Sequence, residues 1–172
     1  MRTAIAIFAK TPGVSPIKTR LAAAIGKERA EEFYHLSVKA TEELIQQLRE
    51  QSEGKVMPFW ALAEKEGSGH PMWNAFDTLW TGDGDLGKRM YTVSAGLLKE
   101  YNQVIFIGTD IPQLRPETIL EAMERLEAGP DQCVIGPSPD GGFYLIGSAF
   151  PIPEEIWTSV TYSRAEIGRA HV

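Results

Sequence analysis

A cluster of positively charged side chains follows the first apolar stretch of the chain. Lys10, Lys18 and Arg20 lie in the segment FAKTPGVSPIKTRL (residues 8–21), together with two prolines and a glycine. The backbone N–H groups of such a loop, and of a helix that begins behind it, attract anions. Arginine binds a phosphate through two parallel hydrogen bonds, whereas lysine acts as a mobile point charge. We therefore predict that these cations bind nucleotide phosphates; the alternative is that they are solvated surface residues.

A second candidate is the carboxylate of Asp110, which ends the apolar segment VIFIGTD (residues 104–110). A carboxylate next to a polyphosphate is unfavourable unless a divalent cation lies between them. Mg²⁺ and Mn²⁺ can be bound by one or two carboxylates while substrate phosphates complete the coordination shell. Asp110 is therefore our first candidate metal ligand. Its alternative role is to cap the turn formed by TDIP (residues 109–112).

Two glycine-rich segments carry further carboxylates. Asp140 lies in GPSPDGGFYLIG (residues 136–147), where Asp-Gly-Gly forms either a hairpin turn or a surface that a ligand can approach closely. Asp85 lies in GDGDLGKRM (residues 82–90), which predicts either a helix N-cap with flexible glycines or a rim over the ligand. We predict that Asp140 is a second metal ligand and the general base that accepts a proton from an acceptor hydroxyl.

Composition and missing motifs disfavour several classes of protein. The net charge of the 172 residues is −6 at pH 7, which argues against nucleic-acid binding because that requires a basic face. The loop of residues 8–21 has neither the P-loop pattern nor the G-x-G-x-x-G pattern, which disfavours a P-loop NTPase and a dinucleotide dehydrogenase. Cys133 is the single cysteine, so we expect a core position for it and a reducing compartment. No apolar run approaches about 18 residues, so we expect no membrane span and a cytoplasmic location.

Apolar runs bounded by turn-forming residues predict the elements that position these groups. Helices are expected within residues 27–54, 86–101 and 115–129. Strands are expected at residues 3–8, 55–64, 77–80, 103–108, 132–136 and 143–148. This alternation predicts an α/β protein with three layers, α/β/α, around a mostly parallel sheet.

Two details of these elements are specific enough to be tested. Pro58 within the second strand indicates an edge strand or a bulge, because proline cannot donate a backbone hydrogen bond. Residues at three- and four-residue steps predict one apolar stripe on the first long helix, made of Phe33, Leu36, Ala40, Leu44 and Leu48.

Taken together, the four segments that carry Lys18, Asp85, Asp110 and Asp140 resemble a known family in content, order and spacing. The chain is similar, over roughly residues 3–157, to the glycosyltransferase-like proteins of family DUF2064, some of which are assigned to arsenosugar biosynthesis. That family resembles the nucleotidyltransferases of molybdenum-cofactor and coenzyme F420 assembly. The resemblance implies the GT-A fold of nucleotide-diphospho-sugar transferases in a single domain, residues 1–172. The last residues, EIGRAHV at about 166–172, show no clear apolar stripe, and we expect either a truncated or non-native C-terminus or a frayed C-terminal helix there.

The resemblance also implies roles for individual residues. Asp110 would match the metal-binding aspartate of the D-x-D motif of GT-A enzymes, and Asp140 would face the acceptor or complete the metal shell. The residues that it implies in nucleotide binding are Lys10, Lys18, Arg20, Gly84, Asp85 and Leu86.

We therefore expect a transferase that depends on Mg²⁺ or Mn²⁺ and moves a sugar from a nucleotide-diphosphate donor to a small acceptor. The first alternative is a nucleotidyltransferase that joins an NTP to a phosphorylated small molecule and releases pyrophosphate. The second alternative is a non-catalytic nucleotide-binding module. The expected partners are the nucleotide substrate, the acceptor and a second copy of the chain in a homodimer.

Overall fold

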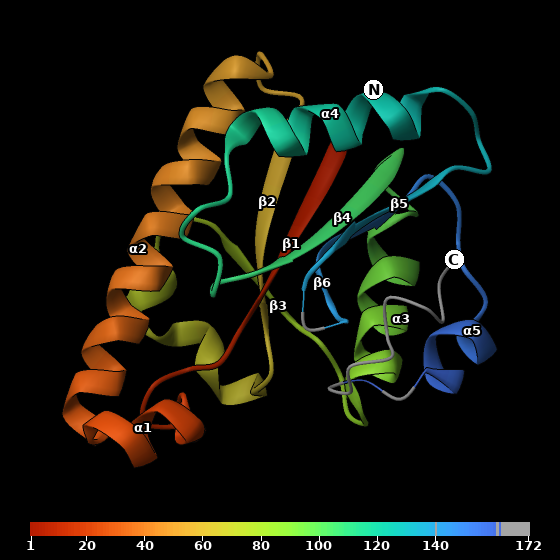
Figure 1. The fold of residues 1–172 in the computed structure, drawn as a ribbon. Helices are drawn as coiled ribbons and strands as arrows, with labels where there is room; N and C mark the ends of the chain where they lie inside the picture. Colours follow the sequence, from red (N-terminus) through yellow and green to blue (C-terminus); the bar gives the residue numbers. More distant parts are fainter. Residues whose placement is uncertain (140, 161, 163–172) are drawn as a thin grey trace.

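The computed structural model describes residues 1–139, 141–160 and residue 162, so the expectation for 166–172 lies outside the described residues. Six strands form one sheet in the order β3-β2-β1-β4-β6-β5 (Figure 1). The strands are β1 (Thr3–Ala9), β2 (Val56–Leu62), β3 (Asp77–Trp80), β4 (Gln103–Gly108), β5 (Cys133–Pro137) and β6 (Phe143–Ser148). The pairs β1–β2, β1–β4 and β2–β3 are parallel, whereas β6 runs antiparallel to β4 and β5.

Helices cover both faces of this sheet. The helices are α1 (Thr19–Ile25), α2 (Lys27–Gln51), α3 (Leu86–Leu97), α4 (Pro116–Glu127) and α5 (Glu154–Ser159), with short 3₁₀ helices η1 (Lys65–Gly69) and η2 (Pro71–Trp73). On β1, Ile5 and Ile7 belong to the core shared with α2 and α4, and Ala4 and Ala6 to the core shared with α3. This alternation is the two-residue period of a strand that is buried on both faces. The predicted three-layer α/β/α fold is therefore confirmed (Figure 1).

The predicted stripe of α2 is wrong in the first half of the helix. Phe33 and Leu36 are exposed, whereas Tyr34 and Val38 are buried. The buried residues Tyr34, Ser37 and Thr41 also lie at three- and four-residue steps, each one position after a residue of the predicted stripe. The hydroxyl group of Tyr34 bonds to the backbone of the loop that follows β1. In the second half of the helix, Leu44 and Leu48 are buried as predicted.

Two further expectations about strands need correction. Pro58 lies in β2, which is an interior strand between β1 and β3. Because β3 first pairs with β2 at Phe59, Pro58 sits where β2 has a single neighbouring strand, and no ladder hydrogen bond on the β3 side is lost there. Cys133 is exposed at the start of the edge strand β5, so it is not a core residue.

Across the described residues, every helix is too short or too polar to span a bilayer.

Candidate functional site

The groups singled out in the sequence meet at one edge of the sheet. β1 and β4 are adjacent and parallel, so their carboxyl ends lie side by side. Lys10 directly follows β1, and Asp110 follows β4 by two residues. Ligands of open α/β sheets bind at this edge, outside the carboxyl ends of the strands. The neighbouring order of β1 and β4 therefore brings the basic loop and the acidic turn together.

Lys18 and Asp110 form a direct ion pair through Nζ and Oδ1. The Lys18 side chain is 19% exposed and the Asp110 side chain 61%, so the pair lies at the mouth of the site. Lys18 precedes the first residue of α1 and adopts φ 47° and ψ 46°, a left-handed conformation. That conformation is costly for a residue other than glycine and is characteristic of functional sites. The backbone thus holds the ammonium group of Lys18 over the end of β4.

A cavity of about 660 Å³ opens between these residues. Its lining includes three cationic side chains, Lys10, Lys18 and Arg89, against one carboxylate, Asp110. We call it the cationic cavity. This excess of positive charge is local, because the whole chain has a net charge of −6. A cavity of this kind attracts a compact anion such as a diphosphate.

Arg89 is a site residue that sequence reasoning missed. Its Nη1 donates to the carbonyl oxygen of Ala63 at 2.8 Å and to Oγ1 of Thr81 at 2.9 Å, while Nε donates to the carbonyl oxygen of Gly84 at 2.9 Å. The guanidinium group therefore joins the segments that follow β2 and β3 to the turn before α3. The sequence feature that could have identified Arg89 is its position in the first turn of a predicted helix. Helical side chains lean toward the N-terminus, and so a cation there can reach the segments that precede the helix.

Tyr34 is a second residue that sequence reasoning missed. Its hydroxyl group donates to the carbonyl oxygen of Lys10 at 2.8 Å and accepts from the backbone N–H of Lys10 at 3.0 Å. Burial raises the pKa of Tyr34 to about 12. Tyr34 fixes the backbone of Lys10 and also lines the cationic cavity. The predicted stripe placed Phe33 in the core in place of Tyr34, so the hydrogen-bond partner that a buried tyrosine hydroxyl group needs was not considered.

The segment before α3 contributes mainly through its shape. Asp85 caps α3, accepting a hydrogen bond from the backbone N–H of Lys88 at 2.9 Å, and Gly84 has φ 103°. Leu86 lines both large cavities of this edge, whereas Gly84 and Asp85 line neither.

A Cβ atom at Gly87 would overlap the carbonyl oxygen of Trp157, so glycine lets α5 pack closely against α3.

Of the two other predicted residues, the structure describes only Arg20. Arg20 lies in α1 and is exposed, and it lines neither cavity. Arg20 is the second residue of α1, which begins at Thr19 immediately after Lys18. Asp140 lies outside the described residues.

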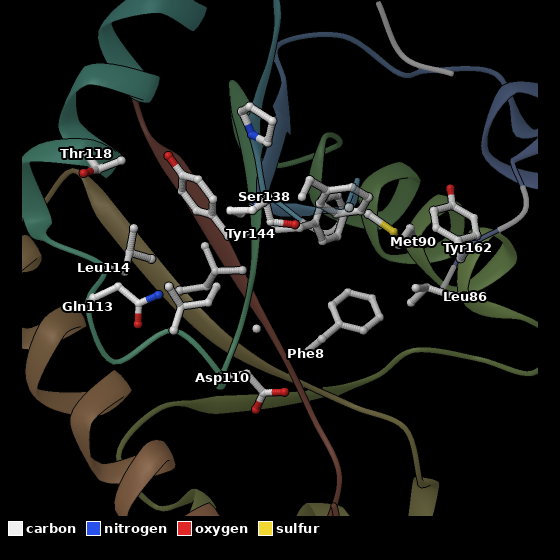
Figure 2. A pocket seen from close by; sticks show the side chains of 18 residues that line it. Phe8, Leu86, Met90, Asp110, Gln113, Leu114, Thr118, Ser138, Tyr144 and Tyr162 are labelled. Carbon is white, nitrogen blue, oxygen red and sulfur yellow. The ribbon is translucent and has the colours of Figure 1, made fainter. Parts of the chain in front are cut away.

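A second cavity, of about 790 Å³, adjoins the cationic cavity (Figure 2). Phe8, Leu86 and Asp110 line both cavities, so the two form one continuous groove. In Figure 2, Asp110 lies at one end of this second cavity, and Thr118 and Tyr144 lie toward the other end. Most of its lining is aliphatic or aromatic. We call it the apolar cavity.

The residues at the junction of the two cavities can bind a divalent cation only with help from a ligand. Among the described residues, no three His, Cys, Asp or Glu side chains come close enough to hold a metal ion. Asp110 is the one carboxylate among the described residues that line the groove, and it is accessible. Mg²⁺ binds in just such sites, through one or two carboxylates and substrate phosphates. The donor set fits a cation held largely by phosphate oxygens.

Comparison with solved structures defines the class of fold. A crystal structure of a "putative nucleotide-diphospho-sugar transferase" from Desulfovibrio desulfuricans aligns with a TM-score of 0.81 over 99% of this chain and 74% of that chain, at 23% identity. The 4-diphosphocytidyl-2C-methyl-D-erythritol synthase of Anaerococcus prevotii aligns with a TM-score of 0.58, at 10% identity, over 95% of this chain and 80% of that chain. A CMP:2-keto-3-deoxy-manno-octonic acid synthetase complexed with CTP aligns with a TM-score of 0.53, at 13% identity, over 96% and 81%. The chain therefore has the nucleotide-diphospho-sugar transferase type of fold.

Comparison of the sequence with family models identifies the family. Residues 59–164 match the family described as "Uncharacterized protein conserved in bacteria (DUF2064)". The chain belongs to this family, as the motifs predicted. The matched region includes Arg89 and Asp110, whereas the loop of Lys10 and Lys18 precedes it. No curated protein matches the sequence.

Proposed function

We propose that this protein is a transferase whose substrate carries a nucleotide diphosphate, and that it moves a sugar from an NDP-sugar to a small acceptor. The observation that carries the proposal is the cationic cavity at the carboxyl ends of β1 and β4. Lys10 and Lys18 from the loop after β1, and Arg89 from α3, line this cavity in a chain that is acidic overall. The fold type agrees with such a substrate, because ligands of α/β sheets bind at this edge.

In this proposal the diphosphate lies between the three cations. Lys18 would leave Asp110 and bind a phosphate oxygen, while Arg89 keeps its three hydrogen bonds and supplies fixed positive charge. The charges are aimed at the leaving group, where negative charge grows as the bond to the sugar breaks. Tyr34 holds the backbone of Lys10, so this cation is presented by an ordered loop.

We propose that Asp110 binds Mg²⁺ or Mn²⁺ when the nucleotide is present. The cation would neutralise charge on the diphosphate when bound. Replacing the ammonium group of Lys18 by a cation at Asp110 leaves Lys18 available for phosphate. The general base toward the acceptor stays a prediction from sequence, at Asp140.

Nucleotidyl transfer is the second candidate. Two structures of similar fold are named as synthetases of nucleotide-linked products, and one of them is complexed with CTP. An NTP could place its phosphates in the same cationic cavity. Release of pyrophosphate from an NTP distinguishes this reaction from sugar transfer.

A non-catalytic nucleotide-binding module would bind nucleotides without turnover of NDP-sugars or NTPs. The homodimer stays a prediction that light scattering tests.

The experiment that tests the proposal compares Asp110→Asn with Glu121→Gln. Glu121 is a matched control, because its side chain is also 61% exposed and ion-paired, to Arg125, and it lies outside the groove. Calorimetry measures the binding of UDP, GDP, CDP and ADP, each with MgCl₂ and with EDTA.

We expect a crossing pattern. In EDTA, Asp110→Asn should bind the preferred nucleotide at least as tightly as the wild type, because a negative charge is removed and Lys18 is released. With Mg²⁺, the wild type should gain roughly tenfold or more in affinity, about 1.4 kcal/mol, and Asp110→Asn should not. Glu121→Gln should behave as the wild type. A magnesium effect that survives in Asp110→Asn refutes the metal site, and no binding by any nucleotide refutes the function.

A further inference from the structure

The residues that line the apolar cavity indicate the chemical class of the acceptor, the second substrate of the proposed reaction. We propose that the acceptor is an uncharged molecule in which a hydroxyl group is attached to an apolar ring or chain, and not a phosphorylated or carboxylated one. This inference rests on the proposed function, since it names the acceptor class of the same groove. It starts from the difference between the two halves of the groove, which meet at Asp110.

Charge is distributed unequally between the halves. The cationic cavity has Lys10, Lys18 and Arg89 in its wall, whereas the described residues that line the apolar cavity include one ionised side chain, Asp110. An acceptor phosphate or carboxylate in the apolar cavity would lose hydration without gaining a described cation, because Lys18 at the junction binds the diphosphate. This uncompensated loss of hydration disfavours a charged acceptor. The arrangement thus separates an anionic donor from an uncharged acceptor.

The walls of the apolar cavity are preformed. Phe8 packs edge-on against Phe106 at a centroid distance of 5.7 Å, and Phe106 packs against Trp157 at 5.9 Å. Phe106 is 3% exposed and Trp157 is 2% exposed, so the ring of Phe8 is supported from beneath. Pockets that bind small molecules are mostly apolar, and a fixed wall lowers the entropy lost on binding.

The far end of the apolar cavity is also shaped for a flat group. A Cβ atom at Gly136 would lie 2.5 Å from the ring of Tyr144, so the missing side chain lets this ring lie against the backbone of β5. The ring of Tyr144 lies near Leu114 and Thr118 at this end (Figure 2). An apolar ring of the acceptor would pack here, and its hydroxyl group would point toward Asp110 at the junction.

The transfer then balances as follows. The acceptor oxygen forms a bond to the sugar carbon, the bond from that carbon to the diphosphate oxygen breaks, and the electron pair leaves with the diphosphate into the cationic cavity. The hydroxyl proton passes to a general base. Polar groups in the apolar cavity, such as the side chains of Gln113 and Thr118, orient the acceptor and carry no formal charge.

The test uses benzyl alcohol and benzyl phosphate, which differ only in the phosphate group. Saturation-transfer NMR titrations measure both affinities with excess inorganic pyrophosphate, which is added to fill the cationic cavity. We expect benzyl alcohol to bind at least tenfold more tightly than benzyl phosphate. Thr118→Trp, which fills the far end, should lower the affinity for the alcohol at least tenfold, with a melting curve as the control for folding.

A charge variant tests the electrostatic part without filling the cavity. Gln113→Arg adds a cation to the apolar cavity at an exposed position, and Gln132→Arg is the matched control, exposed and outside both cavities. Gln113→Arg should lower the preference for the alcohol at least tenfold, and Gln132→Arg should leave it unchanged. Equal binding of the two probes to the wild type, or no binding of the alcohol, overturns the inference.

The nucleotide titrations separate this inference from the proposed function. If nucleotides do not bind while benzyl alcohol occupies the apolar cavity with the expected preference, the proposed function fails and the selectivity of the cavity stands. If nucleotides bind and benzyl phosphate matches or exceeds the alcohol in the wild type, the acceptor class is wrong and nucleotidyl transfer to a phosphorylated acceptor gains support.

Discussion

Replacement of Lys18 separates its role in binding from its cost to the fold. Lys18 combines a left-handed backbone conformation, with φ 47° and ψ 46°, with an ammonium group in the cationic cavity. Lys18→Ala and Lys18→Gly both remove the charge, but only glycine adopts this conformation without strain. The two variants should therefore bind nucleotide equally poorly and differ in stability.

The magnitudes follow from these two features. The left-handed conformation costs a residue with a Cβ atom roughly 1–2 kcal/mol. Glycine loses roughly 0.4–1 kcal/mol more conformational freedom on folding, which offsets part of that gain. Lys18→Gly should thus be more stable than Lys18→Ala by about 1 kcal/mol, a difference of about 2–4 °C in Tm for a chain of 172 residues. A hydrogen bond to a charged group contributes about 1.5–3 kcal/mol, so nucleotide affinity should fall roughly 10- to 150-fold in both.

Thermal denaturation followed by circular dichroism measures the stability difference, and calorimetry measures the affinity of the best nucleotide. Arg125→Ala is the control, because it removes an exposed cation whose ion pair, to Glu121, lies outside the groove. A Lys18→Gly variant that is less stable than Lys18→Ala refutes the strain argument. Full nucleotide affinity in either variant refutes the role of Lys18 in phosphate binding.

Three further predictions concern the fold around the groove. Gly87→Ala should lower the free energy of unfolding by about 1–3 kcal/mol, because the new methyl group overlaps the backbone of Trp157. Gly96→Ala in the same helix has open space and should raise the free energy of unfolding by up to about 1 kcal/mol. Denaturant titration measures both variants, and equal effects refute the packing argument. Burial raises the pKa of Tyr34 from 10.0, the ordinary value for tyrosine, to about 12 in the folded state. The folded state therefore retains the proton to higher pH than the unfolded state, so stability should fall as pH rises from 10 to 12. Tyr34→Phe should flatten that decline and weaken nucleotide binding, and an unchanged pH profile would contradict the assignment. Cys133 should react with a thiol reagent in the native protein at the rate of an exposed thiol, and the modified protein should retain nucleotide binding, because this residue lies outside the groove.

Much of the fold could be predicted because its signals are local. The segments that form β1 and β4 are continuous apolar runs between turn residues, and Asp85 is a good helix cap directly before the apolar period of α3 begins. The encounter of Lys18 with Asp110 was also within reach, because both follow parallel strands and the carboxyl ends of such strands share one edge. The two side chains meet because β1 and β4 are adjacent in the sheet.

The remaining features depend on contacts between distant segments. Arg89 joins carbonyl and hydroxyl oxygens of Ala63, Thr81 and Gly84, and no local pattern shows that these three segments meet. The orientation of α2 was mispredicted for a different reason. The buried residues Tyr34, Ser37 and Thr41 have the same helical periodicity as Phe33, Leu36 and Ala40, but the prediction chose the more apolar set. The length of the loop before α1 decides that Lys18 enters the groove and Arg20 does not.

The most direct test of the account is a crystal structure of the protein soaked with the best-binding nucleoside diphosphate and Mn²⁺. We predict the diphosphate in the cationic cavity, with phosphate oxygens within hydrogen-bonding distance of Lys18, the ion pair to Asp110 broken, and the metal on Asp110. A nucleotide bound elsewhere on the molecule, or one bound with the Lys18–Asp110 pair intact, would refute the assignment of the cationic cavity as the diphosphate site.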